Sequence, residues 1–427
     1  MKQIFTRSVF PLLVFTAIFV MLSGNANATS QWAKKYEISC KVCHTAFPRL
    51  TYMGEKFMRD GYQFDQDGDE KKDLISSRLV LDELKNLFGI RLNLRPVEFQ
   101  TNAIYEGGSP EDRVTFGQTN WVQFFVAGSI YKNTSIFIEN EIDDNGKSHF
   151  SWYKLGFHNL FGQQGTANIV IGQQAPMEWM PASGRLRVMT DKESLAWGPK
   201  SSGGAGQDSS GNTIAEDSVG LAGARPAISF YGYQGPVVYF AGVSPGDKAG
   251  KDDVNKEVNY WAGGRVEATG GAFEGSAIGF FAMRGIDTTG TAIPNVDLPK
   301  NAFTRYSLQG VLRSGPLDLI AAYTFGNDDN WTLATTSQEQ KFEAYFAQAA
   351  YLFGTDNKYY ATLRYEKLGY DDDNLSASDD DQNLGASIWY FPMENLKVGL
   401  TALLDVEHKS SDKNKSNLFH LTVRTMF

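Results

Sequence analysis

Alternation of apolar and polar side chains, with a period of two residues, constrains the fold of this chain more than any other feature. Between residues 396 and 406 every even-numbered side chain is apolar, whereas Lys397 and Asp405 stand at odd positions. Residues 359–366 alternate in the same way, with Arg364 on the polar side. A period of two is that of a β-strand with one apolar and one polar face. We therefore expect a mainly β protein.

The segments that connect these strands alternate in length. We count sixteen candidate strands between about Ile90 and Phe427, joined by fifteen connections. The short connections lie near residues 130–134, 158–167, 234–236, 269–271, 314–316, 353–358 and 391–395. The long connections lie near residues 101–118, 143–150, 174–226, 244–258, 285–304, 326–342, 369–382 and 407–416. Barrels of the bacterial outer membrane have short turns at one end and long loops at the other. A soluble β-sandwich gives no reason for such alternation, so the pattern predicts an antiparallel transmembrane barrel of about sixteen strands.

The two ends of the strand region add detail to this prediction. Residues 419–427 alternate strictly and close on Phe427, which resembles the assembly signal at the end of outer-membrane barrels. In the first strand the alternation slips between Leu94 and Val97, around Pro96. Proline has no backbone N–H to give to a neighbouring strand, and it is tolerated at bulges. We therefore expect a bulge or an early strand end at Pro96.

The first residues read as a secretory signal peptide. Lys2 and Arg7 precede an apolar run that ends near Leu22, and Ala-Asn-Ala at 26–28 is a cleavage pattern. We expect residues 1–28 to be removed and both ends of the barrel to lie in the periplasm. The formal net charge of −9 argues against nucleic acid as a partner, since nucleic acid binding rests on basic patches.

The only two cysteines of the chain stand together in the sequence Cys40-Lys41-Val42-Cys43-His44. C-x-x-C-H is the attachment signature of c-type haem. Two thiols one helical turn apart can each bond a vinyl group of one porphyrin, and the histidine that follows becomes an axial ligand of the iron. A disulfide at this spacing closes almost no loop, and a zinc site needs four ligands. The sequence therefore predicts one covalent haem c on Cys40, Cys43 and His44.

The haem-bearing segment is too small to shelter a haem by itself. We assign residues 29–75 to a helical, monohaem cytochrome c-like segment and residues 76–427 to the barrel. A segment of this length buries little core, whereas a barrel of sixteen strands leaves a lumen. We therefore expect the segment to plug the lumen, so that the barrel supplies the missing wall.

These features together resemble the fused monohaem cytochrome c–porin family of outer-membrane iron oxidases. The specific match is confined to residues 40–62 and consists of the attachment motif followed by Pro48, Leu50, Gly54, Phe57 and Gly61. The resemblance implies that Pro48, Leu50 and Phe57 pack on the haem. It also implies that extracellular Fe(II) gives an electron to the haem, which passes it to a periplasmic c-type cytochrome. Two alternatives stay open: a diffusion porin with a structural or sensory haem, and a conduit that sends electrons outward to an extracellular acceptor.

Two further sets of residues are weaker candidates. The second axial ligand is sought among methionines, for which ordinary packing is the competing explanation: Met53, Met58, Met177, Met180 and Met189. A histidine facing the lumen is another candidate. The acidic run Asp371, Asp372 and Asp373 falls in a long connection, where it either attracts an extracellular cation or is simply a solvated loop.

Overall fold

The structure is a computed structural model. It describes residues 31–64, 84–103, 111–117, 121–131, 133–183, 196, 221, 224–245, 257–288, 300–330, 339–371, 381–408 and 416–426. The expected signal peptide, Met189, Asp372, Asp373 and Phe427 lie outside these ranges, as does the predicted boundary between residues 75 and 76. None of the described helices has both the length and the apolar character needed to cross a bilayer.

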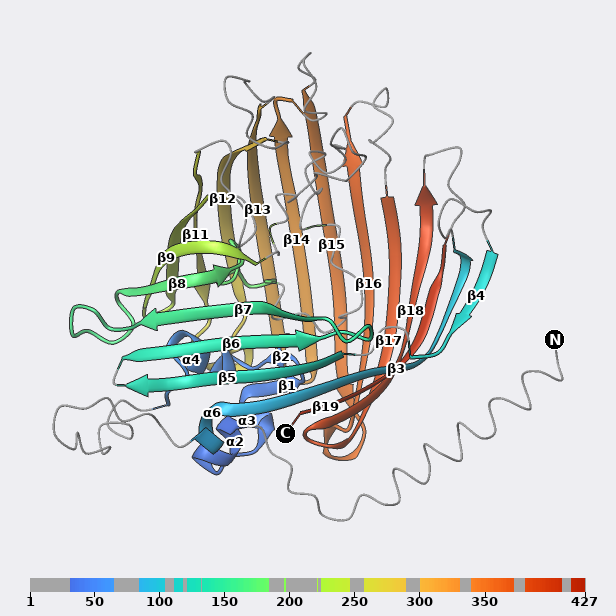
Figure 1. Ribbon diagram of the computed structural model, residues 1–427, viewed down its shortest axis with the longest axis horizontal. Helices are drawn as coiled ribbons and strands as arrows, with labels where there is room; N and C mark the ends of the chain where they lie inside the picture. The colour runs from blue at the N-terminus through green and yellow to red at the C-terminus, as the bar shows by residue number, and fades with distance from the viewer. Residues whose placement is uncertain are drawn as a thin grey trace.

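The described strands form one closed antiparallel barrel (Figure 1). The strands are β3 (Phe88–Ala103), β4 (Glu111–Thr115), β5 (Trp121–Tyr131), β6 (Thr134–Ile142), β7 (Ser148–Phe157), β8 (Asn168–Gln174), β9 (Arg225–Gln234), β10 (Val237–Ser244), β11 (Asn259–Glu267), β12 (Ala277–Thr288), β13 (Lys300–Ser314), β14 (Leu317–Asp328), β15 (Gln340–Phe353), β16 (Tyr359–Tyr370), β17 (Asp381–Met393), β18 (Leu396–His408) and β19 (Leu418–Met426). Sixteen of them, β3 and β5 to β19, follow one another around the wall, and β19 closes the barrel by pairing with β3. The predicted fold class is confirmed.

Strand β3 pairs with two different strands along the same edge, and the short strand β4 is the partner of its second half. Residues 88–93 of β3 pair with β5, whereas residues 98–103 pair with β4. On the other side of β3, the pairing with β19 shifts register between Leu94 and Val97. Pro96 lies inside this bulge, so the predicted bulge is confirmed and β3 continues past it.

The predicted connections fall where the strands end. One local exception concerns length: the connection at 143–147 is shorter than the one at 158–167, although the first was predicted as long and the second as short. At these two connections the strands are therefore recognised by the period of two on either side, and the length of the connection alone does not show at which end of the barrel it lies. The polar and apolar faces follow the alternation as well. Leu363 and Leu400 are 55% and 57% exposed on the outside, whereas Arg364 and Lys397 are buried.

The N-terminal segment is a set of short elements at the end of the barrel where the short turns lie. It contains α2 (Gln31–Tyr36), α3 (Cys40–Cys43), the two-stranded ribbon β1 (His44–Ala46) and β2 (Arg49–Leu50), and α4 (Tyr52–Arg59); α6 (Leu84–Leu87) leads into β3. In Figure 1 these blue elements lie at the lower end of the barrel, beside β5 and β6. Phe57 and Tyr62 pack with Phe125 and Phe137 of the barrel in one apolar cluster.

The connection after β8 turns into the barrel. Residues 175–183 are buried. The backbone N–H of Ala182 donates to Gln309 Oε1 at 3.0 Å, and Glu178 pairs with Lys154. This part of the longest connection therefore folds inward, and it contributes to the wall described next.

Candidate functional site

The two cysteines occupy the first and last positions of the single-turn helix α3. Ser39 caps the helix, and its Oγ accepts the backbone N–H of Lys41 at 3.1 Å. Both cysteines are free thiols of intermediate exposure. His44 follows at once and leaves the helix in an extended conformation. One helical turn therefore separates the two cysteines, and His44 directly follows the second.

A short turn of the barrel holds the start of this helix. The Ser39 hydroxyl donates to Glu394 Oε1 at 2.7 Å, and the backbone N–H of Cys40 donates to Glu394 Oε2 at 2.9 Å. Glu394 lies in the turn between β17 and β18. The attachment helix is thus fixed to the barrel by two hydrogen bonds to a single carboxylate.

Helix α4 packs closely against the end of α3, and Gly54 of α4 lies directly against the Cys43 backbone. Thr51 caps α4, and its hydroxyl donates to the Val42 carbonyl at 2.6 Å. A Cβ atom placed on Gly54 would lie 2.2 Å from the carbonyl oxygen of Cys43. Because such an approach is impossible for two non-bonded heavy atoms, only glycine allows α4 to lie this close to the cysteines and His44.

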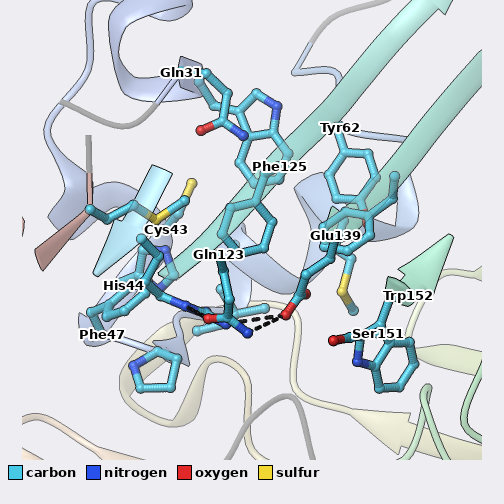
Figure 2. Close-up of a pocket in the computed structure, with 18 of the residues that line it drawn as sticks. Gln31, Cys43, His44, Phe47, Tyr62, Gln123, Phe125, Glu139, Ser151 and Trp152 are labelled. Atoms are coloured by element: carbon cyan, nitrogen blue, oxygen red, sulfur yellow. Dashed lines mark hydrogen bonds and ion pairs between the residues drawn. The ribbon is translucent and has the colours of Figure 1, made fainter. Parts of the chain in front are cut away.

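A cavity of about 480 Å³ opens beside Cys43 and His44, within the range of sites that hold small ligands and cofactors. Its lining residues come from both halves of the chain: Gln31, Trp32, Cys43, His44, Phe47, Pro48, Leu50, Gly54, Phe57, Met58, Tyr62, Arg91, Trp121, Gln123, Phe125, Phe137, Glu139, Glu141, Ser151, Trp152, Ala175, Glu178, Ser183, Arg424 and Met426. In Figure 2, His44 and Phe47 lie on one side of the cavity, and Glu139, Ser151 and Trp152 lie on the other. The expectation that the barrel supplies a wall for the segment fits this lining.

Burial shifts the pKa values of His44 and Cys43. It lowers the pKa of His44 to about 4, against the opposing effect of the Pro48 and Arg49 carbonyls. The Nδ1 atom of His44 is buried and makes no well-formed hydrogen bond. Burial, with a smaller contribution from Cys40, raises the pKa of Cys43 to about 11. At neutral pH His44 is therefore a neutral imidazole, the form that ligates iron.

These residues fit a covalent haem c. The two thiols have the required spacing, and the neutral His44 directly follows them. Cys43 and His44 line a cavity that contains both aromatic and charged side chains, whereas Cys40 is not among its lining residues. Pro48, Leu50 and Phe57, which the resemblance implies as packing residues, all line this cavity. Among the groups described, His, Cys, Asp and Glu side chains form no cluster of three that could hold a bare metal ion.

The four described methionines that are candidates for the second axial ligand lie in different environments. Met58 lines the same cavity as His44, whereas Met53 is 43% exposed and is not among the lining residues. Met177 and Met180 are buried in an apolar cluster between the inward loop and the barrel. The sulfur of Met177 accepts a hydrogen bond from Gln309 Nε2 at 3.2 Å. The structure thus brings Met58 together with His44 and gives Met177 and Met180 a packing role.

Asp371 has a structural explanation as well. Its Oδ1 atom accepts the backbone N–H of Lys341 at 2.9 Å and the side-chain amide of Gln340 at 3.0 Å. These bonds join the ends of β15 and β16.

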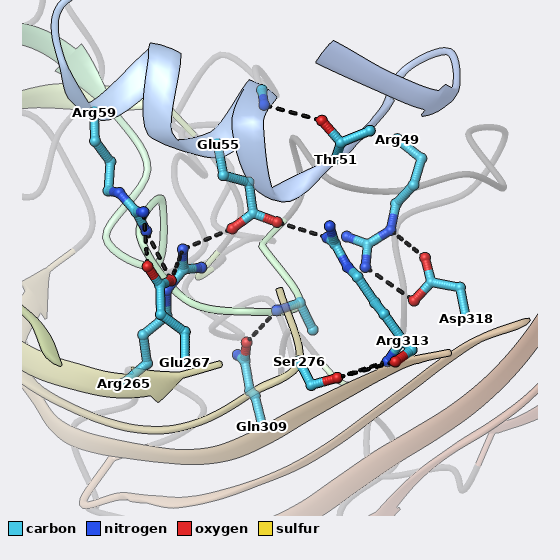
Figure 3. Close-up of polar contacts among 12 residues, drawn as sticks. Arg49, Thr51, Glu55, Arg59, Arg265, Glu267, Ser276, Gln309, Arg313 and Asp318 are labelled. Carbon is cyan, nitrogen blue, oxygen red and sulfur yellow. Dashed lines mark hydrogen bonds and ion pairs between the residues drawn. The ribbon is translucent and has the colours of Figure 1, made fainter. Parts of the chain in front are cut away.

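A group of buried ion pairs fastens the segment to the barrel wall (Figure 3). Arg49 makes a two-pronged contact with Asp318, at 2.6 and 3.0 Å, and Arg59 makes another with Glu267, at 2.8 and 2.7 Å. Glu55 lies between Arg265 and Arg313, 2.6 Å from each. We call these seven residues the charged seat: Arg49, Glu55, Arg59, Arg265, Glu267, Arg313 and Asp318. The sequence does not predict the seat, because its members are far apart in the chain.

A hydrogen-bonded chain reinforces the seat at the end of α4. The Tyr231 hydroxyl donates to the Arg59 carbonyl at 2.6 Å, so it accepts from Nδ1 of His158 at 3.0 Å. Nε2 of His158 therefore accepts from Ser135 at 2.7 Å. This histidine faces the barrel interior, but its two ring nitrogens are used within the chain.

No protein-family model and no curated protein matches this chain. Solved structures do. An anion-selective porin from Comamonas acidovorans is similar at a TM-score of 0.54 and 12% identity, over 80% of this chain and 98% of that one. The outer membrane channel DcaP of Acinetobacter baumannii is similar at 0.52 and 12% identity, over 82% and 100%. OmpT of Vibrio cholerae, with loop L8 deleted, is similar at 0.50 and 13%, over 80% and 99%. At these identities the likeness establishes the porin-like barrel fold, and the match leaves about a fifth of this chain uncovered.

Proposed function

We propose that this protein is an electron-transfer protein of the bacterial outer membrane, in which one covalent haem c is held between a plug segment and a porin-like barrel. One observation carries the proposal: Cys43 and His44 line a cavity that the segment does not close by itself and whose wall is completed by residues of the barrel and of the inward loop 175–183. A haem c would supply one-electron oxidation and reduction at the iron.

The barrel supports the membrane location on physical grounds. Large apolar side chains such as Leu363, Leu400 and Ile278 are exposed on its outer face, whereas charged side chains are buried within it. A soluble protein would be inverted in this respect, whereas a barrel in lipid requires an apolar exterior. We place the short-turn end, with the plug, on the periplasmic side.

The finer assignment is that extracellular Fe(II) is the electron donor and a periplasmic c-type cytochrome the acceptor. This assignment rests on the resemblance of residues 40–62 to the fused cytochrome–porin family. The chain's contribution is physical. Cys40 and Cys43 hold the group, His44 binds its iron, and the cavity wall excludes water from one side. Exclusion of water disfavours the oxidised haem, which carries more positive charge, and so raises the reduction potential.

The test is spectroscopic and has two stages. The purified protein is first denatured and stained for haem, which stays on the chain only if it is covalently bound. It is then mixed with Fe(II) without oxygen while the haem absorption bands are followed. We expect haem staining and rapid reduction, and we expect His44→Ala to abolish the reduction. His149→Ala is the matched control, because that histidine is 54% exposed on β7.

The rival functions give different results. A diffusion porin would show a large open pore in planar bilayers, whereas a seated plug leaves a small conductance. An outward conduit would have a strongly negative haem potential and would not be reduced by Fe(II). Absence of haem stain would overturn the proposal itself. If the haem is present but excess Fe(II) leaves its absorption bands unchanged, only the assignment of Fe(II) as the electron donor would be overturned.

A further inference from the structure

Met58 borders two cavities. It lines the cavity beside Cys43 and His44, and it also lines a smaller cavity of about 20 Å³ that Tyr231 and His158 line as well. The smaller cavity has room for about one water molecule. Of the four described methionines that are candidates for the second axial ligand, only Met58 lines the larger cavity. The contacts that hold Met58 at this border therefore bear directly on the haem site.

Two tyrosines of β9 hold the backbone that carries Met58. The Tyr231 hydroxyl donates to the carbonyl of Arg59, the residue after Met58, at 2.6 Å. The Tyr233 hydroxyl donates to the carboxylate of Asp60, which caps the C-terminal end of α4. Tyr231 and Tyr233 stand two residues apart and therefore on the same face of β9. Neighbouring side chains of one strand thus hold consecutive residues at the end of α4.

Tyr231 is itself fixed by its neighbours. Its ring stacks on Trp179 of the inward loop, with the ring centroids 4.0 Å apart. Its hydroxyl accepts from Nδ1 of His158 at 3.0 Å, and Nε2 of His158 accepts from Ser135 at 2.7 Å. Both Tyr231 and His158 are buried. Because a satisfied, buried polar network is rigid, the Tyr231 hydroxyl has a defined position beside the end of α4.

Gly61, directly after the cap of α4, lies against the His158 ring. Its φ is +71°, in the left-handed region that favours glycine. A Cβ atom placed on Gly61 would lie 2.4 Å from both Cδ2 and Nε2 of His158. The ring cannot turn away without losing its bonds to Tyr231 and Ser135. His158 therefore sets how closely the end of α4 approaches the barrel.

We infer that Tyr231 and His158 are positioning residues for Met58, and that they hold it in place as the second axial ligand of the haem iron, an inference that rests on the proposed function. A methionine side chain has three rotatable bonds and defines its own direction poorly. Its reach toward an iron atom therefore depends on where its backbone lies. The bond from Tyr231 to the Arg59 carbonyl and the contact of Gly61 with His158 fix that backbone from the barrel side.

Loss of the Tyr231 hydroxyl should shift the balance between bound and displaced Met58. One neutral hydrogen bond corresponds to about a fivefold change in such an equilibrium. Displacement of the thioether opens that side of the iron to an external ligand such as imidazole. The apparent affinity for imidazole rises as the displaced state becomes more populated. A loss of stability elsewhere in the barrel leaves this affinity unchanged.

The experiment is an absorption titration of purified, haem-loaded protein with imidazole. Tyr231→Phe removes the hydroxyl and keeps the ring on Trp179, and we expect it to raise the affinity about fivefold. His158→Leu should act in the same direction, and His158→Gln, which can still donate and accept, should act less. Tyr239→Phe is the matched control. The Tyr239 hydroxyl also donates to a backbone carbonyl, that of Thr166 at 2.5 Å, but on the opposite face of the sheet from Tyr231.

A double variant separates positioning of Met58 from a general structural role. In Met58→Leu the thioether is absent, so adding Tyr231→Phe should leave the affinity for imidazole as it is in Met58→Leu alone. Hydrogen exchange of the amides of residues 57–62 gives a second measurement that does not depend on the iron. Tyr231→Phe should make that exchange about fivefold faster with or without Met58.

Wild-type protein without covalent haem would overturn the proposed function and this inference with it. Covalent haem whose affinity for imidazole is the same in the wild type and in Tyr231→Phe would overturn the positioning role alone, even if the amides of α4 exchanged faster. An equal rise in Tyr239→Phe would overturn it too. A rise that Tyr231→Phe also causes in the Met58→Leu background would do the same, since the hydroxyl would then act without Met58.

Discussion

Glu55 in the charged seat gives the sharpest test of how the plug is held. Its carboxylate lies 2.6 Å from both Arg265 and Arg313, and all three groups are largely buried. Burial alone would raise the pKa of Glu55, but the two arginines outweigh it and lower the pKa to about 2. Glu55→Gln keeps the size of the side chain and removes its charge. It leaves the Arg313 guanidinium without its anion, while Arg265 keeps its pair with Glu267 at 2.9 Å.

The magnitude follows from the shift in pKa. An unperturbed glutamate has a pKa of about 4.3, and one pKa unit corresponds to about 1.36 kcal/mol. A fall to about 2 therefore gives roughly 3 kcal/mol of stabilisation for the ionised, seated state. Removal of one partner from a buried ion pair typically costs about 3–5 kcal/mol, which agrees. A loss of about 3 kcal/mol raises the unseated population by about a hundredfold.

The sign of the pH dependence is also fixed. Because the pKa of Glu55 is lower in the seated state than in the released state, its contribution is complete above pH of about 4.3. It is lost as the pH falls from there through about 2. The seated state of the wild-type protein should therefore lose roughly 3 kcal/mol of stability in acid, while Glu55→Gln should show much less pH dependence over that window.

The assay is hydrogen exchange of the backbone amides of α4 in the membrane-reconstituted protein. We expect about a hundredfold faster exchange in Glu55→Gln at neutral pH, for the reason above. Glu257→Gln is the control, since its pair with Lys300 at 3.2 Å is exposed and such pairs contribute about 0–1 kcal/mol. Unchanged exchange in Glu55→Gln, at neutral pH and in acid, would refute the role of the seat.

Three further substitutions test separate parts of the structure. Met58→Leu should change the haem spectrum and lower its potential if Met58 is the second axial ligand, whereas Met53→Leu should change neither; identical spectra for all three proteins would exclude Met58. Gly54→Ala should displace α4, because its Cβ would lie 2.2 Å from the Cys43 carbonyl oxygen, and we expect much less covalent haem per chain by staining. Leu400→Arg puts a charge on the outer face and should destabilise the barrel by about 2–4 kcal/mol in a lipid unfolding titration; no loss would argue against lipid at that position.

The sequence predicts the barrel well because alternation is a local property. Each strand carries its own period of two, so strand positions, the faces of β16 and β18 and even the bulge at Pro96 can be derived from neighbouring residues. The attachment motif is local too, since Cys40, Cys43 and His44 lie within one helical turn and its next residue. For these features the structure adds bounds and contacts to what the sequence predicts.

The charged seat could not be derived in this way. Arg265 and Glu267 read in the sequence only as polar residues on the inner face of a strand. Their partners depend on how the plug lies in the barrel. A period of two says which face a residue occupies, but it does not say which residue of another segment it meets. The same information is needed to see that Met58 lines the cavity with His44, whereas Met53, Met177 and Met180 are not among its lining residues.

The seat explains why a plug of this kind is charged at all. Buried ion pairs contribute little net stability compared with apolar packing, because both partners lose their hydration. They do penalise every arrangement in which a charge is buried without its partner. The inner wall of the barrel carries Arg265, Glu267, Arg313 and Asp318. Arg265 and Glu267 pair with each other at 2.9 Å, but an apolar plug would bury Arg313 and Asp318 without the partners that Glu55 and Arg49 give them. A segment that presents Arg49, Glu55 and Arg59 in their observed positions pairs with all four of these wall residues. In this orientation His44 also lines the cavity, so the seat and the cavity beside Cys43 and His44 both depend on how the segment lies in the barrel.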